Sequence, residues 1–334
     1  MKETENYFFH VFLSDTDYNR VAYSDFEKED NVKVYWQLNP NKSFLKYIQR
    51  YHCHGGINRI IRIPFKSIWF KRLIDPRKIK DTNRICFVFM YTWVNGLDYI
   101  EFIQYLHRHF PHAKYVCYYN DIISSLSPKA IVRDFERINK YFNLFVTYDK
   151  RDAEQYGMSF FPTSFSDYII SNDKAISSTD ILFLGAAKNR WEKILSVYRF
   201  ATSIGLSCDF YIYKLPYEQQ IILPGIHYIE EPMHYEDYLK YVKKCKCILE
   251  IEQKGAQGAT LRNWEAINYD KLLLTDNDSI VNTEFYDSNY VFFVRDDGSF
   301  EGREIQKNNV YYNPLKEKIR PKRFLEFIEK KLEE

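Results

Sequence analysis

The feature that most constrains the fold is a repeated alternation of short apolar runs and longer stretches with helical spacing. In the first half of the chain, the apolar runs are typical of buried strands, and they occupy residues 7–15, 32–38, 84–93, 114–121 and 143–149. The stretches with helical spacing occupy residues 43–52, 97–110, 128–142 and 150–157. Short apolar strands joined by helices of this length predict parallel βαβ units.

The same alternation restarts after a polar stretch at residues 164–179, which has turn-forming residues and no strong period. We therefore predict an α/β protein with two facing Rossmann-like domains, each built on a parallel sheet, and a cleft between them. The N-terminal domain is expected over residues 1–165 and the C-terminal domain over residues 166–320. A final amphipathic helix at 321–334 suits packing back across the domains.

Composition and charge exclude several classes of protein. An apolar fraction of 46% and a charged fraction of 28% are those of a soluble globular protein, and a net charge of +2 argues against a general nucleic-acid binder. No apolar run reaches the ~18 residues that a membrane span needs, and the N-terminus lacks a signal-peptide core. Six scattered cysteines fit reduced thiols. We expect a cytoplasmic protein without a metal site.

One segment, residues 57–84, is strongly basic and also rich in aromatic and aliphatic side chains. Its only acids are Asp75 and Asp81, and its cations are Arg59, Arg62, Lys66, Lys71, Arg72, Arg77, Lys78, Lys80 and Arg84. Such a helix can lie on the anionic inner face of the cytoplasmic membrane, beside a lipid-linked acceptor. It can equally be a solvated helix whose apolar face packs on its domain. The sequence leaves both interpretations open.

Two glycine turns that lead into helices indicate anion binding. Gly258 precedes a helical pattern that starts at Thr260, and Gly185 ends an apolar run before the cations Lys188 and Arg190. Free backbone N–H groups and the helix dipole both favour an anion at such a place, and basic side chains beside them suit a pyrophosphate. The GxGxxG and Walker A patterns are absent, which disfavours NAD and P-loop chemistry.

Five segments in this order resemble GT-B glycosyltransferases: 146–157, 180–190, 258–266, 271–277 and 284–293. More narrowly, the chain resembles bacterial enzymes of capsule and lipopolysaccharide biosynthesis, including the CgeB-like group. The resemblance implies a metal-independent, hexosyltransferase-type enzyme without a cofactor. It would transfer a sugar from a nucleotide-sugar held by the second domain to a glycan or lipid-linked acceptor held by the first, in capsule, lipopolysaccharide or exopolysaccharide biosynthesis.

The resemblance also assigns residues to the donor. Glu265 matches an acid that in many GT-B enzymes binds the ribose hydroxyls, whereas Gln257 stands where many retaining members carry a second glutamate. The backbone N–H groups from Gly258 to Thr260 would face the phosphates, and Tyr228 and Ile229 would lie near the nucleobase. The full donor set is Gly185, Lys188, Arg190, Tyr228, Ile229, Gln257, Gly258, Ala259, Thr260, Arg262 and Glu265.

An inverting transferase also needs a base near the acceptor hydroxyl. Asp121 is the first candidate because it ends a strand, His54 beside a glycine pair is the second, and Asp15 is the third. Two other functions stay open. One is a nucleotide-sugar 2-epimerase or hydrolase of the same architecture, and the other is a non-catalytic scaffold that binds nucleotide-sugar or glycan.

Overall fold

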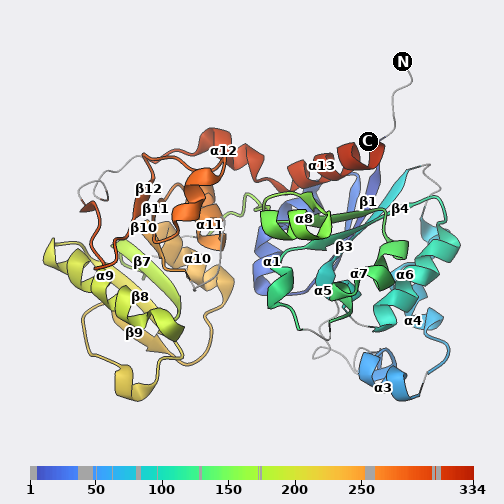
Figure 1. Ribbon diagram of the computed structural model, residues 1–334, viewed down its shortest axis with the longest axis horizontal. Helices are drawn as coiled ribbons and strands as arrows, with labels where there is room; N and C mark the ends of the chain where they lie inside the picture. Colours follow the sequence, from blue (N-terminus) through green and yellow to red (C-terminus); the bar gives the residue numbers. More distant parts are fainter. Residues whose placement is uncertain are drawn as a thin grey trace. The chain divides into compact units, whose positions relative to one another are not determined.

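The computed structural model describes residues 6–36, 48–49, 51–61, 63–79, 84–95, 97–127, 130–171, 173, 175–252, 260–302, 305 and 310–334. The chain forms two compact units (Figure 1). Unit 1 comprises Met1–Ser164 and Arg320–Glu334, and unit 2 comprises Phe165–Ile319. Within the described residues, each unit contains a six-stranded sheet in which every pairing is parallel, so the predicted α/β class with two parallel sheets is confirmed.

The sheet of unit 1 has the order β2-β1-β3-β4-β5-β6. Its strands are β1 (Phe8–Leu13), β2 (Val32–Trp36), β3 (Ile85–Met90), β4 (Lys114–Tyr119), β5 (Leu144–Thr147) and β6 (Ser159–Phe160). The central strand β3 is an uninterrupted apolar run with all its residues buried, as expected for a parallel strand covered on both faces. The Phe12 ring stacks on Phe89 at 4.4 Å between centroids and meets Trp93 and Phe102 edge-on, which fixes an aromatic core around β1 and β3.

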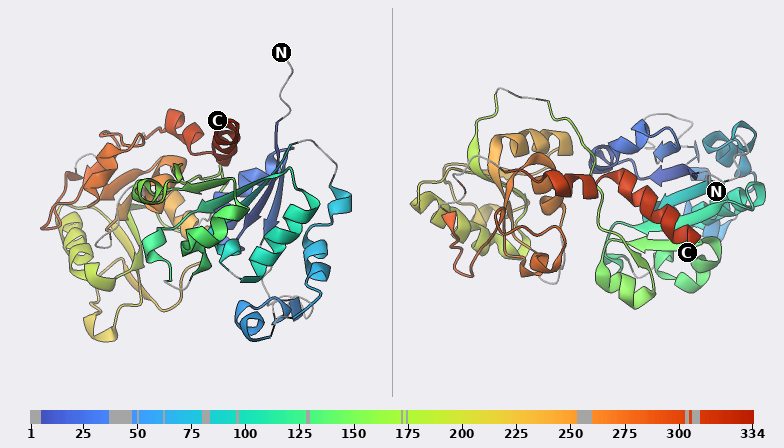
Figure 2. Two further views of the ribbon diagram at one scale, coloured as in Figure 1. Left: turned by 45° about the vertical axis from the view of Figure 1, so that its right-hand side comes forward. Right: turned by 90° about the horizontal axis from the view of Figure 1, so that it is seen from above.

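Helices cover this sheet and complete unit 1. The α-helices are α1 (Asp17–Ala22), α3 (Gly55–Ile60), α4 (Ser67–Leu73), α5 (Tyr91–Val94), α6 (Leu97–His109), α7 (Phe135–Ile138), α8 (Lys150–Tyr156) and α13 (Pro321–Glu333). Short 3-10 turns are η1 (Ser24–Lys28), η3 (Pro76–Lys78), η4 (Ile123–Ser125), η5 (Ile131–Arg133) and η6 (Asn139–Tyr141). The C-terminal helix α13 packs on unit 1 (Figure 2). There, the Phe324 ring contacts the rings of Tyr118 and Phe161.

Unit 2 has the strand order β12-β11-β10-β7-β8-β9. Its strands are β7 (Thr179–Ala186), β8 (Cys208–Tyr213), β9 (Ile226–Ile229), β10 (Cys245–Glu250), β11 (Leu272–Thr275) and β12 (Val291–Phe293). The helical elements are α9 (Trp191–Ser203), α10 (Tyr235–Lys244), α11 (Leu261–Tyr269), α12 (Asn313–Lys318), η7 (Lys188–Arg190), η8 (Tyr217–Gln219) and η9 (Asp278–Asn282). Thr260 caps the start of α11, since its hydroxyl oxygen accepts the Arg262 N–H, and left-handed Asp270 ends the helix.

Three predicted elements are wrong in detail. The strand expected at 84–93 ends at Met90, and residues Tyr91–Val94 turn into a helix. The helix expected at 128–142 is broken, because Asp134 leaves the helical conformation and its side chain caps the next turn at Arg137. The basic segment at 57–84 is not one helix: α4 ends before Asp75, where Pro76 disfavours helical backbone in the preceding residue. Most of the helix expected at 43–52 lies outside the described residues.

The strand orders reveal a switch point in each sheet. In unit 1 the chain passes from β1 to β2 on one side and returns with β3 on the other side of β1. In unit 2 it proceeds from β7 through β8 to β9 and then returns with β10 on the other side of β7. Parallel sheets bind ligands beyond the carboxyl ends of the strands at such a point. No described helix is both long and apolar enough to cross a membrane.

Candidate functional site

Arg190 lies at the switch point of unit 2, beside the carboxyl ends of β7 and β10. Its Nη2 donates to the carbonyl of Ala186 at 2.9 Å, and its Nη1 donates to the carbonyl of Ile251. The guanidinium is partly buried, and its pKa is lowered by that burial and by the nearby charge of Arg262. Arg190 thus links the ends of two neighbouring strands and places a positive charge at the start of α9.

Arg262 supplies a second guanidinium at the same strand end. Its Nη2 donates to the carbonyl of Leu184 in β7 at 2.8 Å, and its side chain lies over the Tyr238 ring at 4.4 Å. Its Nη1 donates to both oxygens of Glu265, at 2.9 and 2.6 Å. Arg190 and Arg262, both assigned to the donor from the sequence, thus hydrogen-bond backbone carbonyls near the carboxyl end of β7.

Glu265, the expected ribose ligand, is fully buried with 0% of its surface exposed. Besides the bonds from Arg262, its carboxylate accepts the hydroxyl of Tyr235 at 2.7 Å and that of Tyr238 at 2.8 Å. Both oxygens are therefore occupied by side chains of α10 and α11. A ribose hydroxyl could reach this carboxylate only by displacing one of these partners, so in the described geometry Glu265 orients Arg262 and joins two helices.

Two further glutamates, missed by sequence reasoning, lie at the carboxyl end of strand β10: Glu250 is its last residue, and Glu252 follows two residues later. Glu250 is buried, and its oxygens accept the hydroxyls of Thr275, at 2.6 Å, and of Thr260. Burial raises the pKa of Glu250 to about 7. Glu252 is half-buried, and burial followed by the charge of Glu250 raises its pKa to about 8. The sequence feature that could have identified both glutamates is the alternation in CILEIE, because residues two positions apart in a strand lie on the same side.

Glu252 differs from Glu250 and Glu265 because one of its carboxylate oxygens accepts no hydrogen bond from the described residues. Its Oε1 is buried and has no hydrogen-bond partner among the residues that the structure describes. Its backbone N–H donates to Asp276 at 2.7 Å, and Asp276 pairs with Lys193 of α9 at 3.0 Å. A buried acceptor without a partner is uncommon in native proteins. Among the described residues, Glu252 is therefore the glutamate at this edge that keeps a buried carboxylate oxygen without a hydrogen bond.

The remaining donor candidates are less directly placed. A Cβ at Gly185 would lie 3.2 Å from Phe183 Cζ and 3.4 Å from Arg190 Nη2, so the Phe183 ring is the tighter neighbour. Lys188 is exposed and left-handed, with φ of 45°. Tyr228 and Ile229 lie in β9, two strands from β7, and the Tyr228 hydroxyl bonds both backbone groups of Ile221 at 2.8 Å. Gln257, Gly258 and Ala259 lie outside the described residues.

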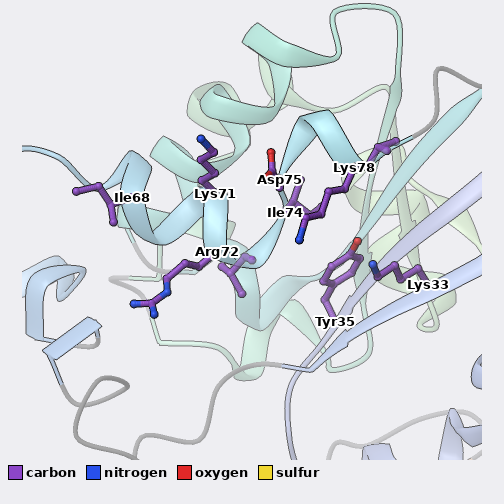
Figure 3. A pocket seen from close by; sticks show the side chains of 10 residues that line it. Lys33, Tyr35, Ile68, Lys71, Arg72, Ile74, Asp75 and Lys78 are labelled. Atoms are coloured by element: carbon purple, nitrogen blue, oxygen red, sulfur yellow. The ribbon is translucent and has the colours of Figure 1, made fainter.

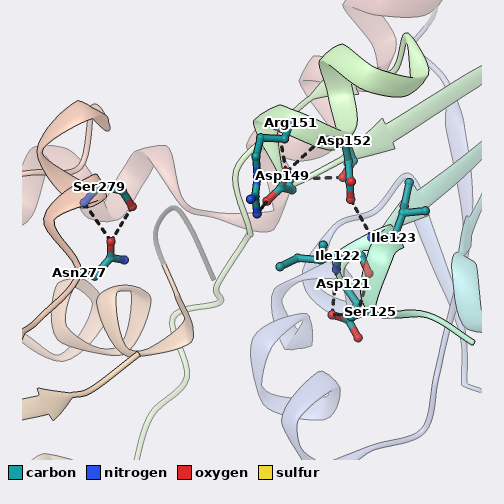
Figure 4. Close-up of polar contacts among 10 residues, drawn as sticks. Asp121, Ile122, Ile123, Ser125, Asp149, Arg151, Asp152, Asn277 and Ser279 are labelled. Atoms are coloured by element: carbon teal, nitrogen blue, oxygen red, sulfur yellow. Dashed lines mark hydrogen bonds and ion pairs between the residues drawn. The ribbon is translucent and has the colours of Figure 1, made fainter. Parts of the chain in front are cut away.

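In unit 1 the three candidate bases occupy different places. Asp121 follows β4, and its Oδ1 accepts its neighbour Ile122 N–H at 2.8 Å and the Ser125 hydroxyl at 3.3 Å, so it caps the turn η4 (Figure 4). Exposed His54 precedes α3, and its carbonyl accepts the Asn58 side chain. Neither residue follows a strand of the switch point.

Asp15 does lie at the switch point of unit 1, directly beyond β1. Its neighbour Ser14 hydrogen-bonds Thr92, which follows β3, so the two strand ends are tied together. The Oδ1 of Asp15 accepts Arg20 Nε at 2.7 Å, and its side chain remains 27% exposed. Sequence reasoning ranked Asp15 third because the strand order, and with it the switch point, cannot be read from the apolar pattern. Within the described residues, no group of His, Cys, Asp or Glu is arranged to hold a metal ion.

Two α/β units with parallel sheets define the class of the fold, which matches that of GT-B glycosyltransferases. An alpha-glucosyltransferase solved with UDP and a 13-mer DNA containing an HMU base has a TM-score of 0.51 and 12% identity, with 97% of this chain and 98% of that chain covered. The glycotransferase of kitacinnamycin has a TM-score of 0.49 and 7% identity, with 98% of this chain and 100% of that chain covered. No family model and no curated protein matches the sequence.

Proposed function

We propose that this protein is a glycosyltransferase that moves a sugar from a nucleotide-sugar donor to an acceptor hydroxyl. The observation that carries the proposal is the position of Arg190 and Arg262 at the switch point of a sheet whose fold matches the GT-B class. Glycosyl transfer releases a nucleoside diphosphate, so the site must stabilise growing negative charge on the leaving group. Two guanidinium groups held in place by backbone carbonyls suit that task.

We assign the donor to unit 2. The diphosphate would lie between Arg190, Arg262 and the start of α11, where the helix dipole favours an anion. Lys188 and Lys193 add positive charge nearby. UDP is the first nucleotide to test, because the similar alpha-glucosyltransferase was solved with UDP. Fixed cations replace a metal ion in this scheme, and binding should persist in EDTA.

We assign different roles to the two carboxylates near the donor. Glu252 would accept a sugar or ribose hydroxyl through its unpartnered Oε1. Glu265 would act as a positioning residue, since its oxygens hold the Arg262 guanidinium. A hydroxyl bound by a buried carboxylate gives strong selectivity against donors that lack it, because the carboxylate is then left unpaired.

We assign the acceptor and the base to unit 1. Asp15 becomes the first candidate base, ahead of Asp121 and His54, because it alone of the three follows a switch-point strand. The acceptor would be a glycan or a lipid-linked oligosaccharide of capsule, lipopolysaccharide or exopolysaccharide biosynthesis, reached from the cytoplasm at the membrane surface. The DNA in the similar structure is the alternative acceptor class, and the experiment below includes it.

The test incubates the protein with a radiolabelled UDP-sugar alone, with lipid-linked or free oligosaccharide, and with DNA that carries hydroxymethylated bases. We expect label to appear in the oligosaccharide only when acceptor is present, and to be lost in the Arg190→Ala variant. Label transferred to DNA would identify DNA, instead of a glycan, as the acceptor. Conversion of the donor without any acceptor would show that the protein is an epimerase or hydrolase and not a transferase. Absence of any turnover across UDP-, GDP- and CMP-sugars would contradict the proposal.

A further inference from the structure

Unit 1 contains a cavity of about 660 Å³ between the edge strand β2 and the segment that runs from α4 to η3 (Figure 3). Strand alternation puts Lys33 and Tyr35 on the same side of β2. Helical spacing puts Ile68, Lys71 and Arg72 on one side of α4, and the turn η3 adds Lys78. The local structure thus brings Lys33 of β2 together with three cations of the segment from α4 to η3 at one cavity.

Among the described residues that line this cavity, cations outnumber acids. Its one carboxylate, Asp75, already accepts Arg77 Nε at 3.0 Å and Nη2 at 2.8 Å, and the Arg77 hydrogen bond lowers the Asp75 pKa to about 2. The four cations are Lys33, Lys71, Arg72 and Lys78. None of them forms an ion pair with another residue that the structure describes. Four like charges around one hollow repel one another, so an anion that enters it relieves that repulsion.

The segment of chain that leads into this cavity carries exposed apolar side chains. Ile68 lines the cavity and is 60% exposed, and Phe65, one turn earlier, is 75% exposed with left-handed φ of 64°. Ile60, in the preceding helix α3, is 85% exposed. Large apolar side chains that gather in one segment of a surface often mark a contact with a membrane or a partner. Here they stand beside cations, which is the arrangement that an amphiphile with an anionic head requires.

We propose that this cavity binds the phosphate-bearing head group of a lipid, while Phe65, Ile68 and Ile60 enter the apolar region next to it. Arg72 can engage phosphate oxygens in pairs, and the lysines act as point charges around the group. Tyr35 forms one wall, and its hydroxyl lies 3.0 Å from Nδ1 of buried His10, which fixes the ring in place. The inference deepens the proposed membrane contact, but it does not depend on sugar transfer.

The test measures co-sedimentation of the full chain with three kinds of vesicle. They contain phosphatidylcholine alone, phosphatidylcholine with phosphatidic acid, and phosphatidylcholine with phosphatidylserine at equal surface charge. We expect the tightest binding to phosphatidic acid, whose phosphate is the most exposed. The double variant Lys71→Gln/Lys78→Gln should weaken that binding about 30-fold, which corresponds to ~1 kcal/mol for each cation. The control Lys140→Gln/Lys150→Gln, which removes two exposed cations of unit 1 outside the cavity, should leave binding unchanged.

Two further arms separate a lipid from a free phosphate compound. Inorganic pyrophosphate should compete with the vesicles at the wild-type cavity. The variant Phe65→Ser/Ile68→Ser should weaken vesicle binding but keep the affinity for pyrophosphate. Equal weakening by the cavity and control variants would overturn the inference, because general surface charge would then explain binding. Pyrophosphate binding without vesicle binding would overturn the lipid as ligand. A protein that binds vesicles in this way yet transfers no sugar would leave the inference standing and remove only the proposed function.

Discussion

The Nη1 atom of Arg262 contacts both carboxylate oxygens of Glu265, at 2.9 and 2.6 Å, within one turn of helix α11. The Glu265 side chain is fully buried, and the Arg262 side chain is 20% exposed. Its other nitrogen, Nη2, holds the carbonyl of Leu184 at the carboxyl end of β7. One ion pair therefore couples the start of α11 to the strand end where the donor diphosphate is proposed to bind.

Removal of one member of this pair should destabilise unit 2. Glu265→Ala should lower the free energy of unfolding by ~3–5 kcal/mol, because it leaves the buried Arg262 charge without its partner. The exposed pair Arg323–Glu326 of α13 has the same spacing, so Glu326→Ala is a matched control whose effect should stay below ~1 kcal/mol. Urea-unfolding curves of the two variants and the wild type, recorded side by side, check this. Equal effects would show that burial of the Arg262–Glu265 pair contributes nothing.

Replacement of Arg190 should weaken nucleotide binding specifically. Lysine cannot bridge the carbonyls of Ala186 and Ile251 and also present a planar guanidinium to a diphosphate. Arg190→Lys should raise the Kd for the nucleoside diphosphate on the order of ten- to a hundredfold, since hydrogen bonds to charged groups contribute ~1.5–3 kcal/mol. Arg199→Lys, an exposed cation of the same helix α9, should bind as the wild type does. Isothermal titration calorimetry measures both, and an unchanged Kd for Arg190→Lys would exclude Arg190 from the site.

The ranking of bases gives a kinetic prediction. Asp15→Asn should reduce kcat by a factor of ~10²–10⁴, as expected when a general base is removed, with little change in KM for the donor. Asp121→Asn should keep nearly all activity, because its carboxylate caps the turn at Ser125. Steady-state kinetics with the acceptor that the labelling experiment selects compare the two variants. A large loss for Asp121→Asn with full activity in Asp15→Asn would reverse the assignment.

Glu250 and Glu252 should make stability fall with rising pH. Burial raises their pKa values to about 7 and about 8, so the folded state holds protons that the unfolded state has released above its lower pKa. Their contribution is therefore present at lower pH and is lost as pH rises through about 7 to 8. Buried His10, with a pKa lowered to about 4, changes stability in the opposite sense, but only at lower pH, up to its ordinary value of 6.5.

The measurement is the unfolding midpoint between about pH 6.5 and pH 8.5, above the range where His10 acts. The wild-type midpoint should decline across this range, and the decline should be smaller in Glu250→Gln/Glu252→Gln. Glu301→Gln, an exposed acid of unit 2, serves as the control and should decline as the wild type does. A flat wild-type profile would contradict the raised pKa values.

The sequence was sufficient for the fold class, because strands such as β3 and β11 are uninterrupted apolar runs and helices such as α6 and α9 keep one apolar side. The prediction from the sequence failed where a local side-chain hydrogen bond overrides the helical periodicity of the apolar residues. The hydrophobic pattern continues through residues 128–142, yet the Asp134 side chain bonds the Arg137 N–H and starts a new turn. Helix propensity and hydrophobic periodicity do not take such a competing side-chain hydrogen bond into account.

The candidate site was predicted only in part. Arg190 and Arg262 were both assigned to the donor from the sequence, and the structure shows that each follows a strand of the same sheet. The burial of Glu265 was not visible, because it depends on Tyr235 and Tyr238 from a helix that precedes it by a whole strand. The position of Asp15 depended on the strand order, which is a property of the folded sheet.

The most direct test of the central proposal is a calorimetric and thermal-shift panel of UDP, GDP and CMP in EDTA, with wild type and Arg190→Ala. A ligand that binds only the folded state stabilises it by ~2.7 kcal/mol at a hundredfold excess over Kd. We expect one nucleotide, UDP first, to bind with stabilisation that EDTA does not affect and that Arg190→Ala abolishes. Binding of no nucleotide, or equal binding by wild type and Arg190→Ala, would contradict a donor site at the end of β7.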